Sequence, residues 1–519
     1  MRRQRIILSA LFLFVSVFSN TVFGAEKARL TGPFDTIRDY LAALEARGKL
    51  LKIKEVDQDK YEGTAFIYRM LEKIGSDKAP AVEFQKVKIN GRLMDGPVIG
   101  NTYCGWDAAA MMFGVEKITD DQGEMYRVVR DKLVNFVKEN GGKWKRIKPV
   151  VVSDRNIPCK EVILKGDEAD LLKFSWFKNN PGDAGQYINT GAVFMEDPEL
   201  GRNVGTYRIQ VKGKNKVGVN TEPGQHGWIF INKAKQKGEK SLPAAIVLGV
   251  DPIIFAMSST KVAGLGEDEL EFAGGLKGKP VELVKCETSN IMVPAKAEMV
   301  IEGDVITEVE DEGPYAEMYG YMGKKHQNWY MNVKAITHRK YPIIINDFTG
   351  VTHTTHMIPW QIDSYLKLKD NFPDLVDMYS PRETVGITIL SINKRFPGQG
   401  MLAGQILLGI SSGAKIAIVV DKDVDVTNIT QVLHAVATRW QPYPASQIIE
   451  RTFTRGVDPS ISQRFITSKI VIDATKQLPQ EGGPESWPDV THTLFERLAP
   501  DAMGIVDKKW EEYWKEWKK

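Results

Sequence analysis

Three charged side chains in the middle of this 519-residue sequence have the types and spacing needed for acid–base chemistry. Arg208 lies on a predicted strand, and Glu312 and Glu317 flank the Gly-Pro pair of the segment EGPYAE. An arginine can keep one of two carboxyl groups ionised while burial raises the pKa of the other, which can then transfer a proton. Taken singly, however, each residue also fits an acidic surface loop or an ordinary strand arginine.

Three further side chains are of the types that bind a divalent cation. Asn203 lies on the same predicted strand as Arg208, so the two side chains face opposite ways unless a bulge intervenes. His226 lies in a predicted turn, PGQHG, and Glu269 begins a run with helical spacing of apolar residues. An amide, an imidazole and a carboxylate together suit Mn²⁺ or Mg²⁺ and are unsuitable for a soft metal.

Two other motifs offer alternative chemistry in the last third of the chain. Gly398, Gly400 and Ala403 follow a predicted strand, and Asp421 ends the next one, as in a dinucleotide-binding turn. The segment NKRFP separates that strand from the glycines, so the turn is not tight, and an ordinary strand–helix connection is the competing interpretation.

The second motif is a histidine pair, His353 and His356, with Asp347 nearby as a third metal ligand. Gly350 and the β-branched residues around it favour a loop, in which the histidines face solvent or a substrate pocket. Asp421, Asp423 and Asp425 also imitate a calcium loop, but Val426 occupies the position that needs glycine.

The elements that must position these residues change in character along the chain. Residues 26–150 show helical periodicity and short strands, which predicts an α/β N-terminal domain. Residues 151–340 contain many short strands separated by Gly and Pro, which predicts a barrel or sandwich. Residues 341–519 alternate strands with helices and predict a second α/β domain, ending in a helix with Trp510, Trp514 and Trp517 on one face for core or oligomer packing.

Charge and composition exclude several classes of protein. The chain has 69 Lys+Arg against 66 Asp+Glu, a formal net charge of +3, which argues against a nucleic-acid-binding protein with a broad basic face. The 3 cysteines are far apart and predict no disulfide framework. The excess charge comes from MRRQR, which precedes a short apolar run, so residues 1–24 are predicted to be a cleaved signal peptide, with an uncleaved membrane anchor as the alternative.

The sequence from about residue 35 to 475 resembles the UbiD-type decarboxylases. The resemblance rests on several motifs in the family's order, of which the densest are RNVGTYRIQV, PGQHG, EDELEFAGGLKGKPVELVKCET and EGPYAE. It implies reversible, non-oxidative decarboxylation of an aromatic or α,β-unsaturated acid with prenylated FMN and a divalent cation such as Mn²⁺; K⁺ is a further candidate ion. The expected fold is an α/β N-terminal domain, a central split β-barrel that binds the flavin, and an α/β C-terminal domain used in oligomerisation.

The same resemblance assigns roles to individual residues. Arg208, Glu312 and Glu317 correspond to the catalytic set, with Glu317 as the proton donor, and Asn203, His226 and Glu269 correspond to the metal ligands. The flavin is expected to contact all of the metal ligands, Arg208 and three further residues: Thr206, Tyr207 and Gln225. Lys415 is a candidate for an additional cofactor contact, and His353, His356 and Trp360 are candidates for closing over the substrate.

The expected partners are a small acid and CO₂, a flavin prenyltransferase that supplies the cofactor, and further copies of the chain in a dimer to hexamer. Export to the periplasm, or membrane anchoring, is expected from residues 1–24, although the family is generally cytoplasmic. Two other functions therefore remain open at this point: an exported apo-protein that binds aromatic acids, and a dinucleotide-dependent oxidoreductase.

Overall fold

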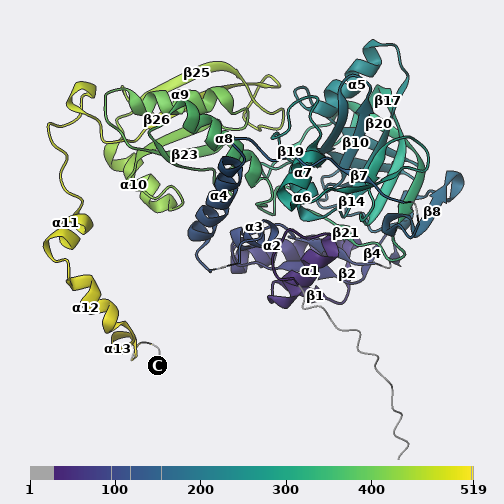
Figure 1. The fold of residues 1–519 in the computed structure, drawn as a ribbon, viewed down its shortest axis with the longest axis horizontal. Helices are drawn as coiled ribbons and strands as arrows, with labels where there is room; N and C mark the ends of the chain where they lie inside the picture. The colour runs from purple at the N-terminus through teal and green to yellow at the C-terminus, as the bar shows by residue number, and fades with distance from the viewer. Residues whose placement is uncertain (1–28, 95, 117–118, 154, 516, 518–519) are drawn as a thin grey trace, which may run out of the picture.

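The computed structural model of the chain describes residues 29–94, 96–116, 119–153, 155–515 and 517 (Figure 1). The predicted signal segment, 1–24, lies outside these residues and stays a prediction. Within the described part of the chain, no helix is both long enough and apolar enough to cross a bilayer.

The N-terminal region is α/β, as its periodicity predicts. Its helices are α1 (Ile37–Ala46), α2 (Glu62–Ile74), α3 (Trp106–Met112) and α4 (Gln122–Glu139). Thr36 and Asp39 form a reciprocal capping box that fixes the start of α1. The main sheet has the order β1 (Leu50–Ile53), β3 (Ala81–Phe84), β6 (Val98–Gly100), β21 (Ile344–Ile345), so a strand from much later in the sequence completes it.

A small second sheet has the order β2 (Val56–Asp57), β4 (Val87–Ile89), β5 (Arg92–Met94), and its strands alternate along the chain with those of the main sheet. Its hairpin turns at Asn90 and Gly91, which have φ angles of 53° and 72°. Two successive residues with positive φ are what a tight two-residue hairpin requires, and the Asn-Gly pair supplies them at low cost.

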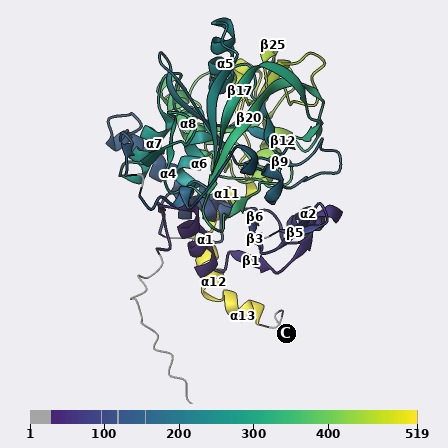
Figure 2. The same cartoon turned by 90° about the vertical axis from the view of Figure 1, so that its right-hand side faces the viewer.

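The middle part of the chain forms a curled nine-stranded sheet, which lies above the N-terminal region in Figure 2 and confirms the predicted split barrel. Its main path runs β11 (Gly201–Thr206), β10 (Ala192–Asp197), β14 (Ser241–Leu248), β17 (Met299–Glu312), β20 (His326–His338), β13 (Lys216–Asn220), β12 (Arg208–Gly213), β9 (Tyr187–Ile188), and β8 (Val162–Lys165) pairs with β20 off this path. Strand β11 therefore lies at one end of this path and the next strand in sequence, β12, lies one strand from the other end, although a single residue, Tyr207, joins them.

Three helices and two small sheets accompany the curled sheet. The helices are α5 (His226–Gln236), α6 (Pro252–Ser258) and α7 (Glu269–Lys277); one sheet has the order β16 (Met292–Pro294), β15 (Glu282–Lys285), β7 (Val150–Val151), and the other pairs β18 (Tyr315–Ala316) with β19 (Met322–Gly323). Helix α7 begins at Glu269, where the sequence predicts it. The predicted turn before α5 ends at Gln225, so His226 is the first residue of the helix rather than part of the turn.

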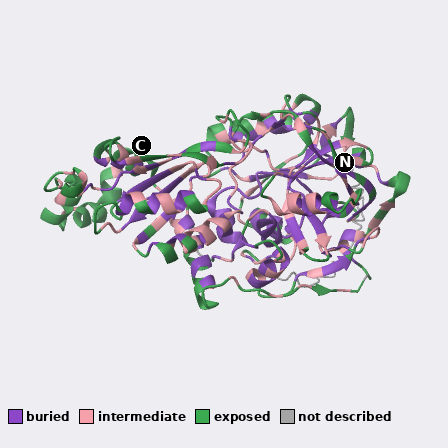
Figure 3. Cartoon of the chain, turned by 90° about the horizontal axis from the view of Figure 1, so that it is seen from above, coloured by how far each residue is buried: buried purple, intermediate pink, exposed green. Residues whose placement is uncertain are grey.

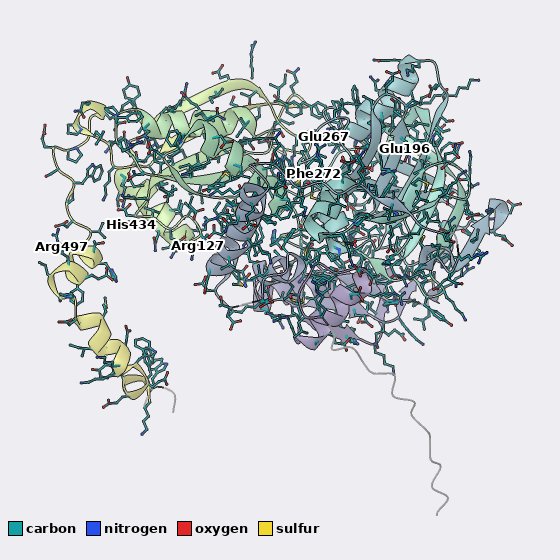
Figure 4. All side chains as sticks on the ribbon, viewed as in Figure 1. Arg127, Glu196, Glu267, Phe272, His434 and Arg497 are labelled. Carbon is teal, nitrogen blue, oxygen red and sulfur yellow. The ribbon has the colours of Figure 1, made fainter. Side chains whose placement is uncertain are left out.

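The C-terminal region contains a five-stranded sheet in the order β22 (Leu375–Tyr379), β23 (Ile387–Ile392), β24 (Ile416–Asp421), β26 (Ile466–Asp473), β25 (Ser446–Phe453). Its three central strands are parallel and its two edge strands antiparallel. The main helices here are α8 (Ile358–Asn371), α9 (Gln399–Ile410) and α10 (Ile429–Arg439). Arg127 of α4 reaches this region (Figure 4), where its guanidinium lies 3.1 Å from Asp425.

The last three helices, α11 (Thr491–Leu498), α12 (Ala502–Lys508) and α13 (Trp510–Trp514), extend away from the body (Figure 1) and are coloured mostly as exposed in Figure 3. Arg497 marks this tail in Figure 4. None of the three helices contains a buried residue, and Trp517 is 80% exposed. The core-packing interpretation of the tryptophans is therefore wrong within this chain, because the rings contact one another instead of the body.

Candidate active site

A cavity of about 550 Å³ lies between the curled sheet and the C-terminal region. This volume is in the range of small-molecule and cofactor sites, roughly 300–1,000 Å³. Of the catalytic, metal-binding and flavin-binding residues that the family resemblance assigns, all but one line it: Asn203, Thr206, Tyr207, Arg208, Gln225, His226, Glu269 and Glu317. Glu312 is the exception, since it is not among the lining residues.

The junction at Tyr207 explains how Asn203 and Arg208 share this cavity. Thr206 pairs with β10, whereas Arg208 pairs with Asn220 of β13, so the strand changes partners across one residue. The Tyr207 hydroxyl accepts a hydrogen bond from the Gly227 amide at 2.9 Å, which ties the junction to the start of α5. The predicted opposite orientation of the two side chains does not apply, because the strand is interrupted between them.

Arg208 lies between the two predicted acids. Its Nε and Nη2 atoms donate to the two oxygens of Glu312 at 3.1 and 2.5 Å, and its Nη1 atom donates to Glu317. The face of the Tyr315 ring packs against the same guanidinium, with its centroid 5.1 Å away. Burial disfavours the charge of Arg208, but the two carboxylates outweigh it and hold the pKa of the guanidinium above its usual value.

Glu312 lies behind Arg208 and is only 1% exposed. Tyr187 donates a hydrogen bond to its Oε1 atom at 3.2 Å, and Nε2 of His326 lies 3.5 Å from its Oε2 atom. Neither Tyr187 nor His326 was predicted from the sequence: Tyr187 lies 125 residues before Glu312, and His326, although close in sequence, reaches Glu312 only through the pairing of β17 with β20. Glu312 thus orients Arg208 from the side opposite the cavity.

Glu317 is positioned differently, since it lines the cavity and is 8% exposed. Its backbone amide donates to the Tyr321 carbonyl at 2.8 Å, which closes a tight turn after the Gly313-Pro314 segment. Burial raises the pKa of Glu317 above its usual value, and the neighbouring Arg208 offsets this only in part. A carboxyl group with a raised pKa that faces a cavity is suited to donate a proton.

The three predicted metal ligands meet at another part of the cavity wall. Glu269 accepts a hydrogen bond from the Val204 amide at 2.9 Å, and its Oε1 atom lies 3.7 Å from Nδ1 of His226, too far for a hydrogen bond. Asn203 is 2% exposed, and its amide nitrogen has no hydrogen-bond partner among the described residues. Buried polar atoms are usually paired, so this arrangement suits a bound ligand.

Histidine, cysteine, aspartate and glutamate alone form no metal-binding group of three or more within the described residues. A cation at this position would therefore depend on the amide of Asn203 as its third protein ligand. Burial raises the pKa of Glu269, and a cation would favour its ionised form.

The C-terminal side of the cavity includes His353, His356 and Trp360, where the sequence places candidates for closing over a substrate. The ring of His356 packs on Phe255, with centroids 4.7 Å apart, and its Nδ1 atom has no partner in the described structure. Burial lowers the pKa of His356 to about 3, so this imidazole is neutral near pH 7. Arg455, which was not predicted as a site residue from the sequence, also lines this side.

Comparison with known proteins identifies the family. Residues 41–125, 150–352 and 355–474 match the N-terminal, Rift-related and C-terminal domains of the 3-octaprenyl-4-hydroxybenzoate carboxy-lyase family, UbiD. The chain is 32% identical to a phenolic acid decarboxylase of Sedimentibacter hydroxybenzoicus, over 90% of this chain and 97% of that one. The chain belongs to the UbiD family. It is therefore a decarboxylase of the carboxy-lyase class.

Other UbiD proteins show the same relationship. A phenolic acid decarboxylase of Bacillus subtilis is 31% identical, over 92% of this chain and all of its own length. Vanillic acid decarboxylase of S. hydroxybenzoicus in its closed form superposes with a TM-score of 0.75 at 29% identity, covering 90% of this chain and 99% of that one. The UbiD-class enzyme HmfF of Pelotomaculum thermopropionicum, in complex with FMN, gives 0.74 at 28% identity, with coverages of 88% and 97%.

The dinucleotide-binding turn predicted as an alternative in this UbiD chain is occupied by structural contacts. At the glycine-rich turn, the Gly398 amide donates to Glu481 at 2.6 Å, so a carboxylate already holds the position that a pyrophosphate needs. Asp421, the acidic residue of the predicted dinucleotide-binding turn, is paired with Arg439 at 2.9 Å. Both residues thus have structural roles.

Asp347, His353 and His356 do not form a metal-binding group within the described chain, because Asp347 bonds to Thr352 and His353 and His356 lie in the predicted loop. Lys415, the candidate for a further cofactor contact, is not among the cavity-lining residues of this UbiD chain. Its ammonium group lies 3.0 Å from Asp458 instead.

Proposed function

We propose that this protein is a reversible, non-oxidative decarboxylase of a phenolic or related aromatic acid, or of an α,β-unsaturated acid, that uses prenylated FMN and a divalent cation such as Mn²⁺. The observation that carries the proposal is the buried Arg208 between Glu312 and Glu317 at a cavity of about 550 Å³. The substrates and flavins named for the relatives support the aromatic acid and the cofactor.

The residues of the cavity fit the proposed flavin and metal. The cation would be held by Asn203, His226 and Glu269, because amide and carboxylate oxygens with one imidazole suit Mn²⁺. Its charge would attract the phosphate of the flavin. Thr206, Tyr207 and Gln225 would contact the flavin itself. Thr206 is already fixed for this task, since its hydroxyl lies 2.9 Å from that of Ser258. K⁺ remains a further candidate ion.

The flavin, when bound, supplies the electron sink that amino-acid side chains lack. The chain supplies orientation and a proton. Arg208 presents a rigid, planar guanidinium to the substrate carboxylate, and Glu312 fixes it from behind through two hydrogen bonds. Glu317, held close to the same guanidinium, delivers a proton to the carbon that loses CO₂. The low exposure of both carboxyl groups keeps water from competing for that proton.

The proposal includes partners outside the chain. A flavin prenyltransferase would supply the modified cofactor, and the protein would assemble as a homo-oligomer between a dimer and a hexamer. The exposed apolar side chains of α11–α13 support assembly, because large apolar side chains left in water favour association.

The proposed activity is tested by CO₂ release. Purified protein loaded with prenylated FMN and Mn²⁺ is supplied with phenolic, heteroaromatic and acrylic acids, and released CO₂ is measured. Release from at least one acid, abolished by leaving out the flavin, is the expected result. A fully loaded protein that releases no CO₂ from any of them would refute the proposed reaction.

An exported apo-protein that binds aromatic acids is the second candidate function, and the basic and apolar start of the sequence favours it. The full Arg208, Glu312 and Glu317 set favours the enzyme instead, since binding alone does not need a proton donor. Absorbance and metal analysis of protein isolated from its native compartment distinguish the two. A colourless, metal-free protein there would support the binding protein.

A further inference from the structure

The cavity contains two kinds of cationic side chain. Arg208 is paired with Glu312 and Glu317, and Arg382 is paired with Asp77 and with the His353 carbonyl. Lys261 and Arg455 also line the cavity, but neither has a carboxylate partner within the described residues. The Lys261 ammonium donates instead to the Gly224 carbonyl at 3.1 Å.

Arg455 has the poorest set of partners of these cations. Its Nη1 atom lies 3.0 Å from the sulfur of Met318, a weak acceptor, and its guanidinium lies 5.1 Å from the centroid of Trp360. A guanidinium has five N–H donors, so most of its hydrogen-bonding capacity is unused by these contacts. Burial lowers the pKa of Arg455, because no carboxylate compensates fully for the loss of water.

The acids that could neutralise Arg455 are already paired. Glu222 lies 2.7 Å from Arg464, and Asp458 lies 3.0 Å from Lys415. Glu317, the residue before Met318, bonds to Arg208. A partly buried guanidinium whose neighbouring carboxylates are all taken gains most from an anion that enters with a ligand.

We propose that Arg455 binds an oxyanion of a ligand in this cavity, either a second acidic group on the substrate or the phosphate of the flavin. The planar fork of a guanidinium matches both groups, because each can accept two parallel hydrogen bonds. The contact with Met318 places Arg455 next to the segment that carries the proton donor, which favours the substrate. The proposal deepens the proposed function by giving the cavity a second anion-binding residue besides Arg208.

The test measures direct binding, so it does not depend on turnover. The affinities of FMN, 4-hydroxybenzoate and the diacid terephthalate are determined by calorimetry for the wild type, R455Q, R455K and R451Q. Arg451 is an exposed arginine four residues earlier, outside the cavity, and R451Q is the matched control.

If the substrate is the source of the oxyanion, R455Q binds terephthalate about 10- to 100-fold more weakly, the loss typical of a hydrogen bond to a charged group, and binds FMN as the wild type does. If the flavin phosphate is the source, the same loss appears for FMN instead. R455K, which keeps the charge, recovers part of either loss, whereas a purely structural role would give no such recovery. Wild-type affinity of R455Q for all three ligands would overturn the proposal.

A second measurement covers the case in which R455Q does not fold. Wild-type protein is treated with phenylglyoxal, which modifies accessible arginines, and the peptide that contains Arg455 is followed by mass spectrometry. Terephthalate or FMN is expected to protect Arg455 and to leave Arg451 unprotected. Absence of protection by both ligands would overturn the proposal even if the protein releases CO₂, and protection without CO₂ release would leave Arg455 assigned while refuting the decarboxylase.

Discussion

The catalytic set on the barrel wall of the cavity and the polar groups of the C-terminal wall differ in how completely they are paired. On the barrel side, Arg208, Glu312 and Glu317 satisfy one another before any ligand enters. On the C-terminal side, Nδ1 of His356 has no partner and Arg455 has no carboxylate among the described residues. The catalytic set on the barrel wall is therefore pre-organised for a reaction, whereas the C-terminal wall, like Asn203 at the predicted metal site, has polar atoms left for a ligand to satisfy.

The largest effect is expected from replacing Glu317, the proposed proton donor on the barrel wall. E317Q keeps the size of the side chain and its contact with Arg208 but removes the acid, so the rate of CO₂ release should fall about 10²- to 10⁴-fold. E310Q is the control, because Glu310 pairs with Lys212 and Lys216 away from the cavity. Flavin-loaded E317Q that incorporates deuterium into product at the wild-type rate would contradict the assigned role.

Removing the Arg208 guanidinium from the same wall should lower the stability of the protein as well as its activity. R208Q leaves two carboxyl groups buried without their partner, which typically lowers the free energy of unfolding by about 3–5 kcal/mol. Urea denaturation at pH 7 measures this loss. The double variant R208Q/E312Q should regain part of it, and a single variant as stable as the wild type would show that the pairs contribute little.

On the C-terminal wall, the expected effect depends on pH. The folded-state pKa of His356 is about 3, below its usual 6.5, so its contribution to stability is present above pH 6.5 and is lost as the pH falls towards 3. Between pH 7 and pH 4, the wild type should lose about 3 kcal/mol more of its free energy of unfolding than H356Q, which cannot titrate there. Urea denaturation at the two pH values measures this, and equal losses for the wild type and H356Q would show that burial does not shift the pKa of His356.

The smallest effect is expected from a change that touches neither wall. Deleting residues 491–519 removes α11–α13, which contain no buried residue. The free energy of unfolding of the body, measured with urea, and the free energy of FMN binding should therefore each change by no more than about 0.5 kcal/mol. Ultracentrifugation of the same protein reports whether the tail contributes to assembly, and a large drop in monomer stability would mean that the tail packs on the body.

The sequence predicts the parts of this site that are local. EGPYAE places Glu312 and Glu317 on either side of one turn, and the apolar spacing after Glu269 correctly predicts the helix it begins. The path of β11 and β12 was not predictable in the same way, because their partners, β10 and β13, are set by the closure of the whole sheet. Nothing in the sequence marks Arg455 as a site residue. It belongs to none of the motifs discussed above, and it has no acidic partner in the described structure.

The one-residue junction at Tyr207 has a consequence for how this site tolerates change in length. Asn203 is fixed by the register of β11 and Arg208 by the register of β12, so an inserted or deleted residue between them has no loop in which to be absorbed. Such a change would shift one strand by a residue and turn its side chains to the other face of the sheet. The length of this segment is therefore constrained from both ends at once, by the pairing of β11 with β10 and of β12 with β13.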